Sequence, residues 1–163
     1  MATLHLIIAL TCGAAGDGNG FAISDTEIVT AYHLAQSNRC SILRGPYLQR
    51  SSHTVGHDLA ILSAPAGARL SPVTIDCGRI QQGVTYTSRG YELIGTGQHT
   101  NVTSTEGYRF VHMAKMHGES FVGMSGAPVL TESGTVIAFI SSGQGNQTFV
   151  KELADTSLCQ TRT

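Results

Sequence analysis

The feature that most constrains the fold of this chain is a succession of short apolar or alternating segments separated by turn residues. Turn signals recur about every 8–12 residues, which favours a β-barrel or β-sandwich over alternating βαβ units. We therefore predict strands along almost the whole chain. In the first half they lie at residues 4–10, 20–24, 27–31, 41–43, 47–50 and 59–63, and in the second half at 84–88, 91–94, 101–105, 108–114, 127–130, 136–141 and 147–150.

The composition agrees with a small β-rich protein. Charged residues make up 13% of the chain, about half of the share in a typical domain, and Gly, Ser and Thr are abundant instead. A hydrophobic content of 41% excludes a wholly disordered chain. The formal net charge of −1 offers no basic surface for nucleic acid. No segment approaches the roughly 18 apolar residues of a transmembrane helix, so we expect no membrane contact from this domain.

The length of 163 residues predicts one domain, which we interpret as two lobes. The first lobe covers about residues 1–70 and the second about 83–150, and a stretch containing Pro and Gly at about 64–82 connects them. The segment 151–163 ends the chain, and a short C-terminal helix is predicted at 150–158.

The N-terminal apolar run and the cysteines each allow two interpretations. The run at 4–10 has some features of a signal peptide, but no basic residue precedes it, and a buried first strand explains it better.

The four cysteines are widely spaced and include no C-x-x-C pair, so a zinc site built from them has no support. They are Cys12, Cys40, Cys77 and Cys159. Two disulfides are arithmetically possible in a secreted chain. Buried reduced thiols are the preferred interpretation.

The strongest chemical motif is Gly-Met-Ser-Gly-Ala-Pro at residues 123–128. Glycines on both sides of Ser125 let the backbone turn sharply, expose the hydroxyl and point successive N–H groups into one concavity. An acyl-transfer nucleophile needs such an exposed oxygen beside amides that stabilise an oxyanion. The motif therefore makes Ser125 a candidate nucleophile.

A nucleophilic serine also needs a base and a group that orients the base, and the chain order restricts the choice. No histidine follows His117, which excludes a triad in the α/β-hydrolase order. The order His, Asp, Ser is available. His33 follows a buried β-type run, and Asp58 stands at the start of another apolar strand, where a partly buried carboxylate needs a partner.

Five segments together resemble the chymotrypsin-like (trypsin-fold) serine endopeptidases. They match, in the correct order, the family's first Gly-rich hairpin, its histidine, aspartate and serine motifs, and the strands that follow the serine. These segments are residues 18–23, 28–33, 56–62, 123–128 and 134–143. The resemblance spans about residues 5–150 and implies an all-β fold of two antiparallel six-stranded β-barrels with a short C-terminal helix.

The resemblance implies a role for each matched residue. His33 is expected to be the general base, Asp58 to orient it and Ser125 to be the nucleophile. The backbone N–H groups of Gly123 and Ser125 are expected to form the oxyanion hole. The implied reaction is peptide-bond hydrolysis through an acyl-enzyme, with no cofactor and no metal.

The resemblance also implies residues that bind an extended peptide. Ser141, Ser142 and Gly143 match the edge segment that pairs with the substrate backbone, and Ser141 is also expected to bond Asp58.

The pocket for the P1 side chain is less well defined by the motifs. In the family that the chain resembles, the residue six positions before the nucleophile lies at the base of this pocket, and here that residue is Glu119, with Ser120 beside it. A carboxylate there would select a basic P1 residue. In the alternative, the short loop shifts the register and Glu119 faces solvent. His117 is a further candidate for the other wall of the pocket.

Two departures from the family pattern are informative. Met124 replaces the aspartate that precedes the serine, so activation by a newly cut N-terminus is not expected. Leu34 replaces the cysteine that follows the histidine, so that family disulfide is expected to be absent.

The short length and the motif at 123–128 resemble the polyprotein-processing proteases of positive-strand RNA viruses, of the astrovirus and arterivirus kind. We therefore expect a viral protease acting on a polyprotein in the host cytoplasm. A compact bacterial-type trypsin-like protease, secreted or periplasmic, is the alternative. A second alternative is an inactive binding module of the same fold. A third class, a metal-binding β-barrel, is not supported by the spacing of the possible ligands.

The remaining histidines have no motif support. His57 is next to Asp58 and should point away from the site along the strand. The others are expected to be structural or exposed: His5, His53, His99, His112 and His117.

Overall fold

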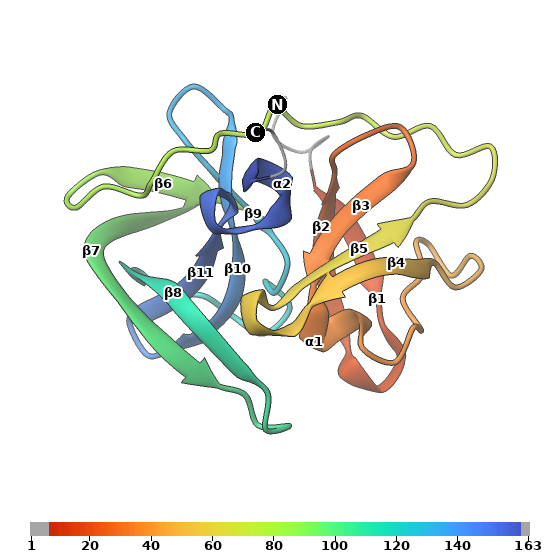
Figure 1. Cartoon of the computed structure of the whole chain (residues 1–163), viewed down its shortest axis with the longest axis horizontal. Helices are drawn as coiled ribbons and strands as arrows, with labels where there is room; N and C mark the ends of the chain where they lie inside the picture. The colour runs from red at the N-terminus through yellow and green to blue at the C-terminus, as the bar shows by residue number, and fades with distance from the viewer. Residues whose placement is uncertain (1–6, 161–163) are drawn as a thin grey trace.

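The computed structural model describes residues 7–160, which form two β-lobes lying side by side (Figure 1). The first lobe is a five-stranded antiparallel sheet and the second a closed six-stranded antiparallel barrel. The predicted all-β, two-lobed fold is confirmed. Within the described residues, no helix is long and apolar enough to cross a membrane.

The first lobe has the strand order β1-β2-β3-β5-β4. Its inward-facing side chains are apolar, and aliphatic residues of β3 and β5 form the centre of the core. The strands are β1 (Ile8–Thr11), β2 (Asp17–Ala22), β3 (Glu27–Ala31), β4 (Gln49–Thr54) and β5 (Leu59–Ser63).

This lobe has one strand fewer than predicted. The segment at 41–43 contributes only an isolated bridge between Ser41 and Thr11. Leu43 and Arg44 have φ angles of 50° and 60°, in the left-handed region that ends an extended strand. The predicted strand at 47–50 begins later, as β4. Residues 4–6 of the predicted first strand lie outside the described residues.

The second lobe closes in the order β10-β11-β8-β7-β6-β9. Two predicted strands, at 91–94 and 101–105, are parts of the single strand β7, whose register shifts between Gly95 and Gln98. Such an irregularity lets a long strand bend around a barrel. The strands are β6 (Thr85–Ser88), β7 (Tyr91–Thr103), β8 (Arg109–His117), β9 (Pro128–Leu130), β10 (Val136–Gln144) and β11 (Gln147–Glu152).

The helical segments are short. The C-terminal helix α2 (Ser157–Gln160) begins later than predicted because Val150 still pairs with Ala114 and Ile140 inside the barrel. The single turn α1 (Tyr32–Ala35) follows β3. The 3-10 turns are η2 (Gly13–Ala15), η3 (Val55–His57) and η4 (Leu153–Asp155).

The lobes share apolar packing. Leu130, Val136, Phe139 and Leu153 of the second half of the chain join the core of the first lobe. Burial of these side chains at the junction holds the two lobes in one arrangement, on which the geometry of a site between them depends.

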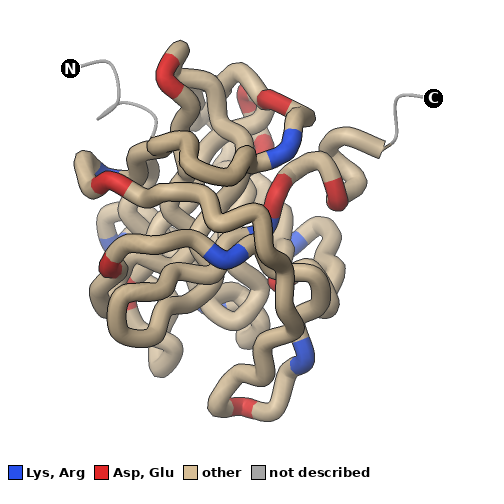
Figure 2. The backbone as a smooth tube through the Cα atoms, turned by 90° about the vertical axis from the view of Figure 1, so that its left-hand side faces the viewer, with Lys and Arg blue, Asp and Glu red and all other residues tan. Residues whose placement is uncertain are grey.

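Lys and Arg are spread along the chain at separated positions, as Figure 2 shows.

All four cysteines are oxidised, so the interpretation as reduced thiols is wrong. Cys12 pairs with Cys40 inside the first lobe. Cys77, in the connection between the lobes, pairs with Cys159 in α2. The partners are 28 and 82 residues apart, so their pairing depends on the folded chain and leaves no local spacing signal.

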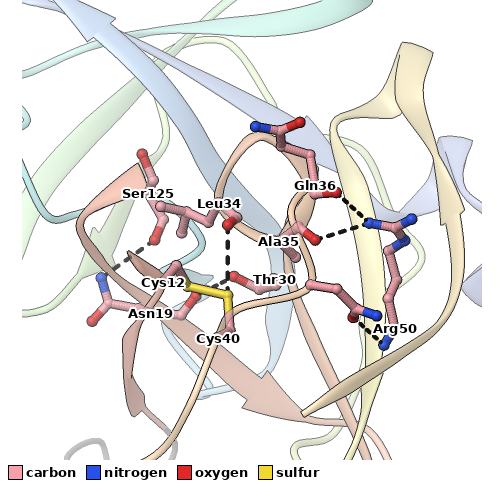
Figure 3. The surroundings of a disulfide bond; sticks show 10 residues. Cys12, Asn19, Thr30, Leu34, Ala35, Gln36, Cys40, Arg50 and Ser125 are labelled. Atoms are coloured by element: carbon pink, nitrogen blue, oxygen red, sulfur yellow. Dashed lines mark hydrogen bonds between the residues drawn. A yellow bond between two sulfur atoms is a disulfide. The ribbon is translucent and has the colours of Figure 1, made fainter. Parts of the chain in front are cut away.

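The first disulfide lies beside the helical turn that carries His33 (Figure 3). The Cys40 Sγ lies 3.6 Å from the carbonyl oxygen of Leu34. Leu34 itself packs against Gly18, where a Cβ atom would overlap its side chain. At Leu34, where the family has a disulfide that is expected to be absent here, the chain makes an apolar contact instead. A different disulfide, Cys12–Cys40, stabilises the same region.

The two disulfides predict the thiol content of the purified chain. Unfolded without reductant, it should give no free thiols with a thiol reagent, and after reduction it should give four, one for each cysteine. The double substitution Cys77→Ala/Cys159→Ala should lower the free energy of unfolding by about 2–4 kcal/mol, because it removes a long covalent loop. Four free thiols without reductant, in protein prepared under oxidising conditions, would contradict the assignment.

Candidate active site

His33 reaches the cleft between the lobes because the chain turns directly after β3. Ala31 is still extended, and His33 is the second residue of the turn α1. The register of the sheet pairs Ala31 with Leu59, so the end of β3 lies beside the start of β5. Asp58 immediately precedes β5, and it therefore comes next to His33.

The Asp58 side chain is fully buried and fully hydrogen-bonded. Its Oδ1 accepts the backbone N–H of His33 at 2.9 Å, and its Oδ2 lies 2.8 Å from Nδ1 of the same residue. The Ser141 hydroxyl, from the second lobe, also donates to Oδ2 at 2.7 Å. Asp58 has a φ of 52°, a left-handed conformation that Asp tolerates better than most residues. These bonds compensate the burial of a charge.

Ser125 lies in the turn between β8 and β9. Its Oγ is 3.0 Å from Nε2 of His33 and 3.3 Å from the carbonyl oxygen of Ser141. Gly126, with a φ of 82°, passes so close to the Asn19 carbonyl that a Cβ atom would overlap it. Only glycine fits this turn. The structure thus brings the three predicted residues, His33, Asp58 and Ser125, into one hydrogen-bonded line.

Two backbone N–H groups of the serine turn, those of Gly123 and Ser125, donate no hydrogen bond within the described part of the chain. The N–H groups of Met124, Gly126 and Ala127 donate to backbone carbonyls. Among the described residues, no acceptor lies within hydrogen-bond reach of the N–H groups of Gly123 and Ser125. Both residues line a cavity beside His33. These two amides are therefore available to stabilise an oxyanion.

Asn19, a buried residue of β2, holds the serine turn from the first lobe (Figure 3). Its side-chain amide donates to the Gly123 carbonyl at 2.6 Å, and its backbone N–H donates to the Ser125 carbonyl at 2.8 Å. The Thr30 hydroxyl donates to the Asn19 carbonyl at 2.7 Å. The sequence motif identifies this segment only as a hairpin, because the Asn19 side chain acts across about 100 residues of sequence.

Two cavities meet at Ser125. One has a volume of about 420 Å³ and the other of about 290 Å³, and His33, Ser125, Ser142 and Gly143 line both. The larger cavity extends toward Phe110 and Glu106, which motif analysis did not identify. Ser141, Ser142 and Gly143 line the larger cavity, and Ser142 and Gly143 also line the smaller one.

Glu119 does not enter the cleft. Its side chain is exposed and lines neither cavity. Gly118 before it is held against the β10–β11 end of the barrel, donating its N–H to Asn146 and accepting the Thr148 hydroxyl. The chain leaves the barrel there, and the next side chain points to solvent. Of the two alternatives at this position, the structure agrees with the exposed one.

Ser120 lies at the cleft. It lines the smaller cavity, and its Oγ occupies the space that a Cβ atom on Gly143 would need. The loop with Ser120 and the strand with Gly143 are therefore in direct contact.

The His33 imidazole has a perturbed pKa. Burial is the largest single influence and lowers the pKa, whereas the hydrogen bond and the charge of Asp58 raise it. Glu106 contributes a smaller attraction in the same direction, and the net pKa of His33 is raised above 6.5. The raised pKa makes His33 a stronger proton acceptor.

The other histidines lie away from the Ser125 hydroxyl. His57 lines neither cavity, and His53 stacks on Tyr32. His117 is exposed on β8 and is not part of the P1 wall. His5 is outside the described residues. His99 and His112 stack on each other.

The comparisons with known proteins identify the family and the fold. Residues 18–139 match the family model of the trypsin-like peptidase domain. No curated protein matches the sequence.

Solved structures share the fold at low identity. The Rv3671c protease from M. tuberculosis in its active form superposes with a TM-score of 0.77 at 15% identity, over 99% of this chain and 82% of that chain. The MamO protease domain from Magnetospirillum magneticum superposes with a TM-score of 0.73 at 11% identity, over 91% of this chain and 92% of that chain. The HRV-C 3C protein with rupintrivir superposes with a TM-score of 0.68 at 12% identity, over 91% of this chain and 92% of that chain. These identities show the fold alone. The family match covers well over half of the chain, which therefore belongs to the trypsin-like peptidase domain family and is a chymotrypsin-like serine peptidase.

Proposed function

We propose that this peptidase cleaves peptide bonds with a triad of His33, Asp58 and Ser125, through an acyl-enzyme. The observation that carries the proposal is the continuous line of hydrogen bonds from the Ser125 hydroxyl through both ring nitrogens of His33 to the buried Asp58 carboxylate. An inactive binding module of the same fold would have no need for this line, which costs the burial of a charge.

Each residue has a defined role in the reaction. The Ser125 Oγ attacks the scissile carbonyl carbon, and its proton passes to Nε2 of His33. Asp58 stabilises the imidazolium that forms, and the amides of Gly123 and Ser125 bind the oxyanion. His33 then gives the proton to the leaving amine. A water molecule, activated by His33, hydrolyses the acyl-enzyme and restores Ser125.

An extended substrate has a free strand edge to pair with. Strand β10 pairs with β9 only from Val136 to Phe139, and Ile140 bonds to Ala127 and Gly126 just beyond. From Ser141 onward this edge of β10 has no strand neighbour in the described part of the chain. We infer that the substrate backbone adds to this edge as a further strand beside Ser125.

The contact between Ser120 and Gly143 supports a small P1 residue. These two segments are the walls that would have to separate around a P1 side chain, and the Ser120 hydroxyl fills the space between them. With Glu119 in solvent, the carboxylate that was considered for binding Lys or Arg at P1 is not at this contact. We therefore propose a preference for Gly, Ala or Ser at P1 in place of the basic residue that Glu119 in the pocket would select.

The source of the substrate is a separate proposal. Processing of a viral polyprotein is supported by the compact size and by the fold shared with the HRV-C 3C protein. The two disulfides favour an oxidising compartment, because they are rare in reducing cytosol. They give the predicted host cytoplasm no support and favour the alternative, a secreted or periplasmic bacterial-type protease.

Labelling of Ser125 tests the nucleophile. A fluorophosphonate should modify the chain once, and Ser125→Ala should abolish the modification and lower kcat by about a millionfold. Ser133→Ala, which changes an exposed serine in the β9–β10 turn, should leave both unchanged. Mass spectrometry of the labelled peptide identifies the site. Stoichiometric labelling that survives Ser125→Ala would exclude the proposed nucleophile.

The pH dependence of kcat/KM tests the base. Protonated His33 cannot accept the serine proton, so activity should be lost as the pH falls through the raised pKa of His33. Glu106→Gln removes a charge that raises this pKa, so its acid limb should lie at lower pH than that of the wild type. The exposed Glu132→Gln should leave the limb in place. An acid limb that Glu106→Gln does not move would contradict the influence of Glu106 on His33.

A peptide library tests the P1 pocket. The wild type should prefer Gly, Ala or Ser at P1, and Ser120→Ala should raise kcat/KM for larger apolar P1 residues by about tenfold, because it removes the filling hydroxyl. Glu119→Gln should leave the profile unchanged. A preference for Lys or Arg that disappears in Glu119→Gln would restore the original prediction and overturn this one.

A further inference from the structure

A second polar cluster lies where β7, β8 and β11 meet. His99 of β7, His112 of β8 and Glu152 of β11 each direct one ligating atom to the same place, and these atoms lie within 4.8 Å of one another. From the sequence alone, both histidines are expected to be structural or exposed. The proposed peptidase reaction uses none of the three residues.

The backbone holds His112 in an unusual conformation at this place. His112 has a φ of 54°, in the left-handed region, and lies at a β-bulge where the register between β7 and β8 shifts. Its N–H donates to the Asn101 side chain at 3.1 Å. Bulges redirect a side chain relative to the regular strand, and strained residues gather at functional sites. Here the bulge stacks the His112 ring on that of His99, with centroids 4.0 Å apart.

Glu152 presents one carboxylate oxygen to the histidines. The side chain is fully buried, and its Oε2 accepts the backbone N–H of Ile80 at 2.7 Å. Its Oε1 lies 2.7 Å from Nε2 of His99. The bond to Ile80 fixes the orientation of the carboxylate, so Oε1 is held toward the cluster.

Asp155 adds an unused acceptor. Its Oδ2 is buried and has no hydrogen-bond partner among the described residues, and it lies 3.9 Å from Nε2 of His112. A buried carboxylate oxygen without a partner is costly. The cluster therefore holds a fourth candidate ligand atom, and this oxygen accepts no hydrogen bond from the described residues.

We propose that His99, His112 and Glu152 bind a zinc-like divalent cation, with the free oxygen of Asp155 as the fourth ligand. Two imidazoles and carboxylates are a donor set that zinc accepts, in tetrahedral geometry, at about 2.0–2.2 Å. Donor atoms on one tetrahedral zinc ion are then about 3.4 Å apart. The donor atoms of His99, His112 and Glu152 lie within 4.8 Å of one another, and the two imidazole rings are parallel. Binding therefore requires the side chains to shift and the rings to turn so that both ring nitrogens face the ion. Mg²⁺ and Ca²⁺ prefer oxygen ligands only, so the histidines select against them.

The Arg79 guanidinium forms ion pairs with the two carboxylates of the cluster, Glu152 and Asp155. Arg79 Nη1 lies 2.6 Å from Oδ1 of Asp155 and 3.5 Å from Oε1 of Glu152. The Arg79 side chain is 54% exposed, so it can leave toward solvent when a cation enters. Arg79 is thus a competitor of the ion, and its removal should strengthen binding.

The ion would connect the bulged part of the β7–β8 hairpin to β11 and η4. The same hairpin carries Phe110 and the segment 102–106, which line the larger cavity at Ser125. The cluster itself lines neither cavity. Its role would be to stabilise the hairpin, independently of whether Ser125 acts as proposed.

Calorimetric titration of the whole chain with Zn²⁺, after dialysis against a chelator, tests the site. We expect one Zn²⁺ per chain and a rise in melting temperature with zinc concentration. Mg²⁺ at the same concentration should produce no rise. His99→Ala and His112→Ala should each weaken binding at least tenfold, and His117→Ala, a change of an exposed histidine on the same strand, should bind like the wild type.

Arg79→Gln leaves every ligand in place and should bind Zn²⁺ more tightly than the wild type. This variant keeps the test decisive if a histidine variant fails to fold. The proposal is overturned if the wild type binds no Zn²⁺, if His99→Ala and His112→Ala bind it unchanged, or if Arg79→Gln binds it more weakly. None of these outcomes depends on peptidase activity, so they are separate from the test of Ser125.

Discussion

The buried carboxylate of Asp58 is the interaction on which the arrangement of the two lobes depends. A fully buried charge costs several kcal/mol unless hydrogen bonds replace its water. Both donors from His33 lie in the first lobe, but the Ser141 hydroxyl comes from β10 in the second. Separation of the lobes would remove this donor and expose the carboxylate. The cost of leaving Asp58 unsatisfied therefore couples the docking of the lobes to the orientation of His33.

Asn19 makes the reciprocal connection. It belongs to the first lobe, yet it bonds the carbonyl oxygens of Gly123 and Ser125 in the second. These two bonds hold the turn on both sides of Met124, while the N–H groups of Gly123 and Ser125 donate to no acceptor in the described part of the chain. The lack of a Cβ atom at Gly126 permits this close approach. Each lobe thus positions the reactive groups of the other, and the site exists only in the assembled pair.

The sequence was sufficient for the parts of the site that local motifs encode. His33, Asp58 and Ser125 each stand at a strand end or a Gly-rich turn, and such positions are recognisable over six or seven residues. The cysteine pairs were not predictable, because 28 and 82 residues separate the partners. The exposed position of Glu119 depends on how Gly118 is bonded to the neighbouring hairpin. Such long-range contacts appear only in the folded chain.

The β7–β8 hairpin joins the two sites described above. The bulge at His112 lies in its paired strands, and its turn carries Glu106, whose charge attracts the His33 imidazole. A bulge increases the local twist of a strand pair, and twist there changes where the turn lies. An ion that fixes His99 and His112 would therefore restrict the distance between Glu106 and His33. Because that attraction varies with distance, a ligand at the bulge would change the pKa of His33 without touching the cleft.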